Sequence, residues 1–134
     1  MAGVWVTEGK QVAANLVFIH ADANRGTTLS LGLFTNSSGL SSASVLSNIT
    51  EAAGASYARI PLADASWSVT GGVATYAQQT FTATVAITGT IYGYFICTTG
   101  SVPKLLAYEI NTAAGPVTMV IGDTYKITPS ITVG

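Results

Sequence analysis

Charge is what this sequence has least of. Of its 134 residues only 8% are charged, five of them basic and six acidic, against about 25% in an average globular domain. Nucleic-acid binding depends on clustered lysines and arginines that neutralise phosphates. The five cations are instead scattered along the chain, at Lys10, Arg25, Arg59, Lys104 and Lys126. We therefore expect no nucleic-acid partner.

Cysteine and histidine occur once each, as Cys97 and His20. A single cysteine excludes an intramolecular disulfide and any zinc site built from several cysteines. Cys97 lies in an apolar stretch, where a thiol behaves as a small buried hydrophobe. We expect neither a metal nor a cofactor.

Long hydrophobic runs are also missing, although apolar residues make up 49% of the chain. No run approaches the ~20 apolar residues that span a bilayer, because threonine and glycine interrupt each one. The N-terminus lacks the basic start and apolar core of a secretory signal. The sequence predicts no membrane partner, and its net charge of −1 leaves little colloidal repulsion, which suits a protein that stays docked to another.

The length of the chain fits one domain. We expect a single β-sandwich domain over residues 15–134, preceded by an arm or edge strand over residues 1–14. A serine-, glycine- and alanine-rich segment at 35–56 is expected to be a long surface excursion with a brief helical piece, since Val45, Leu46 and Ile49 have helical spacing. Long loops of this kind often make the contacts of a domain.

Period-two patterns predict an all-β fold. Along the last segment, apolar residues alternate with hydroxyl-bearing ones and Lys126, which is typical of a strand with one buried face. A Gly71-Gly72 pair between two alternating runs indicates a hairpin. About eight or nine short antiparallel strands at this spacing predict a sandwich of jelly-roll type. The apolar positions of the last strand are Tyr125, Ile127, Pro129, Ile131 and Val133.

The segment from Ile91 to Thr98 is apolar on both faces. One face is expected to carry Ile91, Phe95 and Cys97, and the other Tyr92, Tyr94 and Ile96. A strand of this kind is central in its sheet or is covered on the outside by a partner. Gly93 within it marks the close approach of another backbone or side chain.

No arrangement of side chains predicts catalysis. His20 and Asp22 are expected to be a strand-end histidine and a turn aspartate, since no nucleophile-elbow motif accompanies them. Most of the carboxylates lie near turns or ends, where solvated surface is the expected environment; a structural ion pair with a lysine is expected for Glu109. We expect no catalytic residue and no enzymatic activity. The carboxylates considered are Glu8, Glu51, Asp64, Glu109 and Asp123.

Aromatic residues offer two interpretations. Flat rings at Trp5, Trp67, Tyr92 and Tyr94 are able to form a sugar-binding platform, but core packing is expected for Trp67 and an interface for Trp5 and a tyrosine. Trp5 is expected to insert into a neighbouring chain, or alternatively residues 4–6 add an edge strand to the domain's own sheet. The expected interface residues are Val4, Trp5, Val6, Tyr92 and Tyr94.

Several short sequence motifs follow one another in a distinctive order in the second half of the chain, and the motif Leu31–Asn36 precedes them. They are Tyr57-Ala58-Arg59, Trp67, Tyr76, Gln79–Thr82, Ile91–Phe95, Leu105-Leu106 with Glu109, and Gly122–Pro129. Together they resemble a family of small virion structural proteins of tailed bacteriophages, over residues 28–133.

The resemblance implies a non-enzymatic part of the phage particle, most typically a capsid decoration (cement) protein. Such a protein would oligomerise as a dimer or trimer and bridge subunits of the major capsid protein, on the capsid surface of the virion. A tail or baseplate component is the alternative within the same class. From a different class, a carbohydrate-binding module for host recognition remains open.

Overall fold

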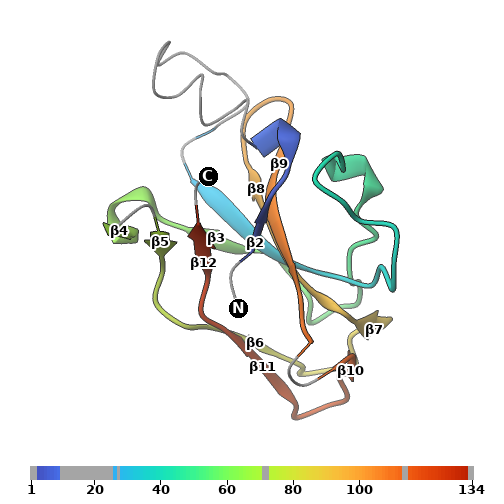
Figure 1. The fold of residues 1–134 in the computed structure, drawn as a ribbon. Coiled ribbons are helices and arrows are strands. Elements are labelled where there is room, and N and C mark those ends of the chain that lie inside the picture. Colours follow the sequence, from blue (N-terminus) through green and yellow to red (C-terminus); the bar gives the residue numbers. More distant parts are fainter. Residues whose placement is uncertain (1–2, 10–25, 27, 71–72, 113–114, 133–134) are drawn as a thin grey trace.

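A computed structural model describes residues 3–9, 26, 28–70, 73–112 and 115–132, and within them the fold is all-β (Figure 1). The sequence also predicts a strand over 15–20 that ends at His20. This strand, Asp22 and the Gly71-Gly72 turn lie outside the described residues. Two 3-10 helices, η1 (Leu46–Asn48) and η2 (Asp64–Ser66), accompany twelve short strands in the described ranges. The strands are β1 (Val4–Trp5), β2 (Leu29–Phe34), β3 (Ile60–Leu62), β4 (Ser68–Thr70), β5 (Val73–Thr75), β6 (Gln79–Thr82), β7 (Thr90–Ile91), β8 (Gly93–Thr98), β9 (Leu105–Ile110), β10 (Val117–Thr118), β11 (Thr124–Ile127) and β12 (Ser130–Thr132).

Five strands form the main sheet, in the order β1-β9-β8-β2-β3 with antiparallel pairing throughout. Its centre is the pair β2–β8, in which all six residues of each strand are matched, from Leu29↔Thr98 to Phe34↔Gly93. Every residue of β8 is buried. The sequence predicted that the segment with two apolar faces is a central strand, and this prediction is confirmed for Gly93–Thr98.

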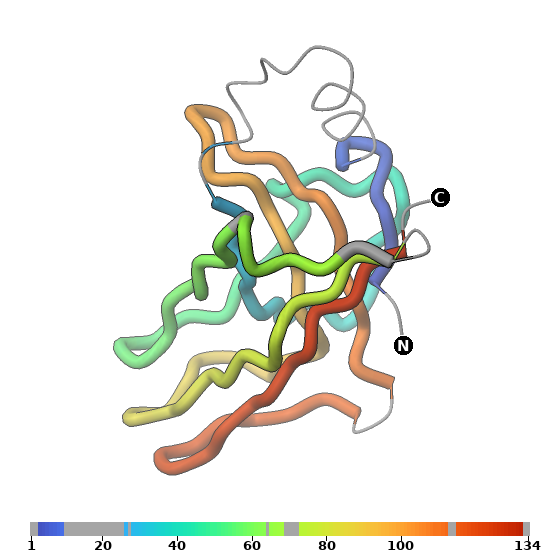
Figure 2. Tube along the Cα trace, turned by 90° about the vertical axis from the view of Figure 1, so that its left-hand side faces the viewer, coloured from blue at the N-terminus to red at the C-terminus, as the bar shows by residue number. Residues whose placement is uncertain are grey.

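The remaining strands form a long irregular ribbon. The segment from β5 to β7 runs antiparallel to the segment from β10 to β12, through the pairs β12–β5, β11–β6 and β10–β7. Figure 2 shows the two segments side by side, in yellow-green and red. Between the strand pairs, hydrogen bonds from Tyr76 N to Pro129 O and from Ile87 N to Met119 O continue the contact. Strand β4 extends the β5 end of the ribbon.

The ribbon packs on one face of the main sheet. The shared core joins Leu31, Leu33 and Ile96 of the sheet with Phe81, Tyr125, Ile127 and Ile131 of the ribbon. Burial of this apolar area is the main stabilising contribution to such a fold. The alternation expected for the last segment is confirmed, because Tyr125, Ile127, Pro129 and Ile131 are buried while Thr124, Lys126, Thr128 and Thr132 are exposed.

The opposite face of the main sheet is covered by the 35–56 excursion. Phe34, Phe95, Cys97 and other buried residues on this face pack against Leu40, Leu46 and Ile49. In Figure 1 the excursion lies to the right of β8 and β9, and β4, β5 and β12 lie to the left. The excursion is anchored at its base, where Asn36 donates to Asn48 O at 2.9 Å and accepts from Thr50 N at 2.7 Å. The chain thus supplies its own cover for β8.

Three segments expected as single strands are interrupted. Alternating threonine and apolar residues over 80–88 predict one strand with Val85 inward. The strand ends at Thr82, and Val85 is 41% exposed. The last segment divides at Thr128 and Pro129, since proline cannot donate a ladder hydrogen bond. The segment over 91–98 breaks at Tyr92, so Ile91 joins the shared core and Tyr92 the outer cluster, opposite to the expected faces. These breaks raise the strand number above the expected eight or nine.

Strand β1 belongs to the chain's own sheet. Val4 and Trp5 pair with Tyr108 and Ala107 of β9, and Gly3 bridges Ile131 of β12. The short strand therefore lies at the sheet edge and also contacts the ribbon. The described part of residues 1–14 has the geometry of an edge strand followed by helical residues 7–9.

Candidate functional site

The expected interface residues do not form one surface. Val6 is completely buried in the outer cluster, and Tyr94 is 7% exposed in the shared core. Trp5 is half-buried against the shared core, and Tyr92 is half-buried against the outer cluster on the other side of the sheet. Val4 is 42% exposed. Val6 and Tyr94 thus offer almost no surface to a partner, because the chain has used both in its own interior.

Several of the carboxylates make contacts within the chain. Glu8 pairs with Lys104 at 3.1 Å and accepts from Leu105 N at 3.2 Å, which holds residues 7–9 against the start of β9. Asp123 accepts from Val120 N at 2.9 Å and closes a turn. The side chain of Asp64 lies outside the described set. Glu109 accepts from the Tyr94 hydroxyl at 2.8 Å, not from the lysine that the sequence suggested.

Glu51 is the centre of a network that the sequence did not reveal. Arg59 donates to both carboxylate oxygens, Nε to Oε1 and Nη2 to Oε2, each at 2.8 Å. The Tyr57 hydroxyl donates to Oε1 at 2.6 Å and accepts from Leu33 N at 3.0 Å. Two-point contacts of this kind fix orientation as well as adding energy. The network ties the end of the excursion to the β2–β3 edge of the sheet.

The same guanidinium contacts the outer cluster. Arg59 Nη1 donates to Cys97 Sγ at 3.3 Å, and its central carbon lies 5.3 Å from the centroid of the Phe95 ring. Burial raises the pKa of the Cys97 thiol, which Arg59 opposes only in part. A buried protonated thiol is a poor nucleophile, so Cys97 acts here as a packing residue.

Replacing Glu51 by glutamine is expected to produce a pH-dependent loss of stability. Burial raises the pKa of Glu51, but the hydrogen bonds from Arg59 and Tyr57 and the charge of Arg59 outweigh it and leave the pKa below its ordinary value of 4.5. A carboxylate with a lowered pKa in the folded state stabilises above its unfolded pKa, and this contribution disappears as pH falls through the folded value. At neutral pH we expect Glu51→Gln to cost about 1–2 kcal/mol, reduced by partial exposure.

Urea unfolding of both proteins between pH 3 and pH 7 checks this expectation. The difference between wild type and variant should be greatest above the ordinary pKa and should shrink toward pH 3. Other carboxylates titrate in both proteins and cancel in the difference. Parallel pH profiles would contradict a stabilising Glu51 carboxylate.

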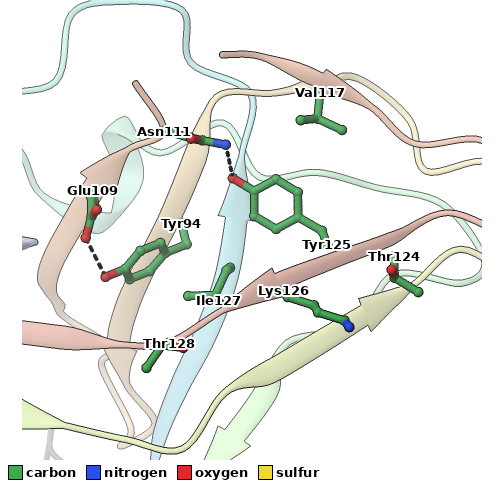
Figure 3. Close-up of a pocket in the computed structure, with 9 residues that line it drawn as sticks. All are labelled: Tyr94, Glu109, Asn111, Val117, Thr124, Tyr125, Lys126, Ile127 and Thr128. Atoms are coloured by element: carbon green, nitrogen blue, oxygen red, sulfur yellow. Dashed lines mark hydrogen bonds between the residues drawn. The ribbon is translucent and has the colours of Figure 1, made fainter. Parts of the chain in front are cut away.

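A groove lies where the main sheet and the ribbon diverge (Figure 3). Its volume is about 500 Å³, and side chains from the end of β9 and from β11 line it, a size within the ~300–1,000 Å³ of ligand sites. Glu109 and Asn111 are two residues apart and project from β9 and the residue after it. The lining residues are Tyr94, Glu109, Asn111, Val117, Thr124, Tyr125, Lys126, Ile127 and Thr128.

Two tyrosine hydroxyls are held by the polar groups of the groove. Tyr94 donates to Glu109, and Asn111 Nδ2 donates to the Tyr125 hydroxyl at 3.0 Å (Figure 3). Burial is the main cause that raises the pKa of both tyrosines, and for Tyr94 the bond to Glu109 adds to it. Both hydroxyls stay protonated and serve as hydrogen-bonding groups rather than as bases.

The sequence did not single out this groove. Tyr94 and Glu109 are cross-strand partners in the β8–β9 register, so their contact depends on a pairing that a sequence does not specify. Asn111 and Tyr125 meet only because the ribbon returns beneath the end of β9. The useful signal was the two-residue spacing of Glu109 and Asn111, which places polar groups on one face of a strand.

Among the described residues, no group of three or more histidine, cysteine, aspartate or glutamate side chains is close enough to hold a metal ion. The described part of the chain also contains no helix long and apolar enough to cross a membrane. Comparison with known proteins finds no matching family model, no matching curated protein and no matching solved structure.

Proposed function

We propose that this chain is a non-enzymatic structural protein of a phage virion, most specifically a capsid decoration protein that oligomerises and bridges subunits of the major capsid protein. The proposal starts from the resemblance of residues 28–133 to small virion proteins. It includes a β-sandwich of jelly-roll type as the finer description of the fold, supported by the main sheet and ribbon that share one core.

The way the chain uses its charges is the observation that carries this proposal. Of the described charged side chains, Glu8, Glu51, Arg59 and Lys104 form internal ion pairs, and Glu109 and Asp123 accept internal hydrogen bonds. Lys126 is exposed on β11, so the described surface offers few charges for pairing with a partner. Attachment to a partner therefore depends on apolar and hydroxyl contacts, which suits permanent assembly.

Exposed apolar side chains gather at one end of the ribbon. Val120 is 56% and Ile121 70% exposed in the turn that Asp123 closes, and Val85 is 41% exposed. Hydrogen bonds from Gly122 N to Ala83 O and from Ala83 N to Asp123 O hold the two segments together there. We assign this ribbon tip, defined as Val85, Val120 and Ile121, to contact with the capsid.

A tail or baseplate protein would bind its partner through the same tip. The position of the protein on the phage particle distinguishes this alternative from a capsid decoration protein. A sugar-binding platform is less well supported. Trp5 and Trp67 are half-buried against the chain's own core, and Trp67 packs edge-on against Tyr76 at 5.2 Å. Neither ring is a free flat surface for stacking.

Aspartate at both Val120 and Ile121 is expected to abolish binding to capsid shells without unfolding the domain. A charge is costly to bury, so the variant should bind at least about 100-fold more weakly. Co-sedimentation with purified shells measures binding, and a thermal melt checks the fold. Binding of the unaltered protein should survive 1 M NaCl, because salt screens ion pairs but not apolar burial.

Val102→Asp is the matched control. Val102 is 55% exposed in the turn between β8 and β9, at the opposite end of the molecule from the ribbon tip. This variant should bind like the unaltered protein. Normal binding by the double variant, or release of the unaltered protein by salt alone, would refute attachment through the tip. Immunogold labelling on the tail would move the protein to the alternative station.

A further inference from the structure

The groove beside β11 is lined by the edge of a strand. Five consecutive residues, Thr124 to Thr128, line it. Successive side chains of a strand point to opposite faces, and here they alternate between exposed and buried. Five neighbours in a row can line one space only if that space lies along the strand's edge, where the main chain is presented.

This edge of β11 has no strand partner among the described residues. Within the described part of the chain, β11 pairs with β6 alone. Ala83 N donates to Asp123 O at 2.9 Å, and antiparallel pairing alternates the direction of main-chain groups from residue to residue. The main-chain groups of Tyr125 and Ile127 therefore point toward β6, whereas those of Thr124, Lys126 and Thr128 point toward the groove.

The adjoining part of the same edge is already occupied by the chain itself. Gly3 N donates to Ser130 O at 3.0 Å, and Gly3 forms a parallel bridge with Ile131 of β12. The main chain of Ser130 also interacts with the Tyr94 hydroxyl. At β12 the edge is thus satisfied by residue 3 and a tyrosine, and along β11 the row of donors and acceptors continues into the groove.

We propose that the groove binds an extended polypeptide segment, which adds to the edge of β11 as a further strand. Main-chain hydrogen bonds supply the affinity in this mode of recognition, and alternate side chains supply the selectivity. Side chains on the inner face of the segment would meet Glu109, Asn111 and Tyr125, which favours short hydroxyl-bearing residues there. Side chains on the outer face would lie beside Thr124, Lys126 and Thr128.

A second copy's β11 is a poor occupant. Antiparallel pairing of two β11 edges about Lys126 would place the two ammonium groups opposite each other, and like charges in that position are destabilising. Edge lysines commonly prevent such self-pairing. We therefore assign the groove to a segment of a different polypeptide rather than to the β11 of a second copy. The inference stands apart from the virion proposal, because its test uses no particle.

The probe is the capped peptide acetyl-Thr-Val-Thr-Val-Thr-amide, in three forms with identical side chains. One form is unmodified, one is N-methylated at the second and fourth residues, and one is N-methylated at all five. The alternate peptide, methylated at the second and fourth residues, keeps its N–H donors along one edge. Its other edge cannot pair with a second peptide molecule. The fully methylated form has no main-chain N–H on its five residues and keeps only the terminal amide and the hydroxyls as donors.

Amide chemical shifts of the full-length ¹⁵N-labelled protein are the readout. The unmodified and alternate peptides should shift the amides of Thr124, Lys126 and Thr128 in a saturable titration. The fully methylated peptide should bind about tenfold more weakly or not at all, because it loses two or more hydrogen bonds. Thr80 and Thr82, whose main-chain groups lie on the edge of β6 away from the groove, should not respond.

Three results would overturn the proposal. They are the absence of any shift, equal binding by the fully methylated peptide, and equal shifts at Thr80 and Thr82. Shifts caused by glucose or galactose at Glu109 and Asn111, with none from the peptides, would make the groove a sugar site instead. A Lys126→Pro variant with a normal melt should lose the response, and an unchanged response would also contradict strand addition.

Discussion

The Gly93→Ala variant is expected to lose about 3 kcal/mol of stability, the upper end for inserting a methyl group into a packed site. A Cβ at this position would lie 2.0 Å from Glu109 O and 2.7 Å from Phe34 Cζ. The carbonyl belongs to the paired strand β9, so it cannot move without opening the sheet. The prediction that Gly93 marks a close approach is confirmed by these distances.

Gly3→Ala is the matched control, since Gly3 is also buried in the described structure. A Cβ there would meet Tyr108 O at 3.5 Å, which is ordinary van der Waals contact. Urea unfolding should show a change of less than about 0.5 kcal/mol for this variant. Equal stabilities of the two variants would show that β8 and β9 are not packed as described.

The Phe95→Ala variant should be destabilised by about 3–5 kcal/mol, the range for emptying a buried phenylalanine site. Phe95 is completely buried under the excursion, and Gly32 provides its space, because a Cβ at Gly32 would lie 2.4 Å from Phe95 Cζ. The variant also removes the ring beneath the Arg59 guanidinium. Chemical denaturation, followed by tryptophan fluorescence, measures the loss.

Phe95→Leu separates packing from ring chemistry. Leucine fills most of the site, so this variant should cost roughly 1–2 kcal/mol. If alanine and leucine both remain within about 1 kcal/mol of the unaltered protein, the outer face of the main sheet is not covered by the excursion in solution. Such a result would make the outer face of β8 a candidate surface for binding a partner.

The sequence predicted the all-β class and the buried side of the last segment because alternation is a local property. It missed the interruption at Pro129, where two halves of that segment pair with different strands. Alternation through Pro129 continues unchanged on either side of the break. The local pattern therefore predicted which side chains are buried, but not that the two halves pair with different strands.

The cover over β8 shows a second limit of the sequence. Its anchors, Leu40, Leu46 and Ile49, are scattered through serine and glycine. The sequence suggested a short helix from the spacing of Val45, Leu46 and Ile49, within a contacting loop. The structure contains one 3-10 turn there, closed by Asn48 Oδ1 accepting from Val45 N at 2.8 Å. Which face of which sheet the three side chains cover depends on distant strands. The polar groove was missed for the same reason.

The order of the main sheet also affects when this fold is able to form during synthesis. Strand β2 is synthesised early, whereas its partner β8 is synthesised much later. The interval between the synthesis of β1 and that of its partner β9 is longer still. A ribosome adds roughly 5–20 residues per second, so the apolar face of β2 stays unpaired for seconds. The 35–56 excursion follows β2 immediately and binds its end, from Thr35 N to Thr50 O at 2.7 Å and from Ala52 N to Leu33 O at 3.0 Å. The nascent chain thus carries an early partner for the end of its first central strand, and it keeps these contacts in the complete fold.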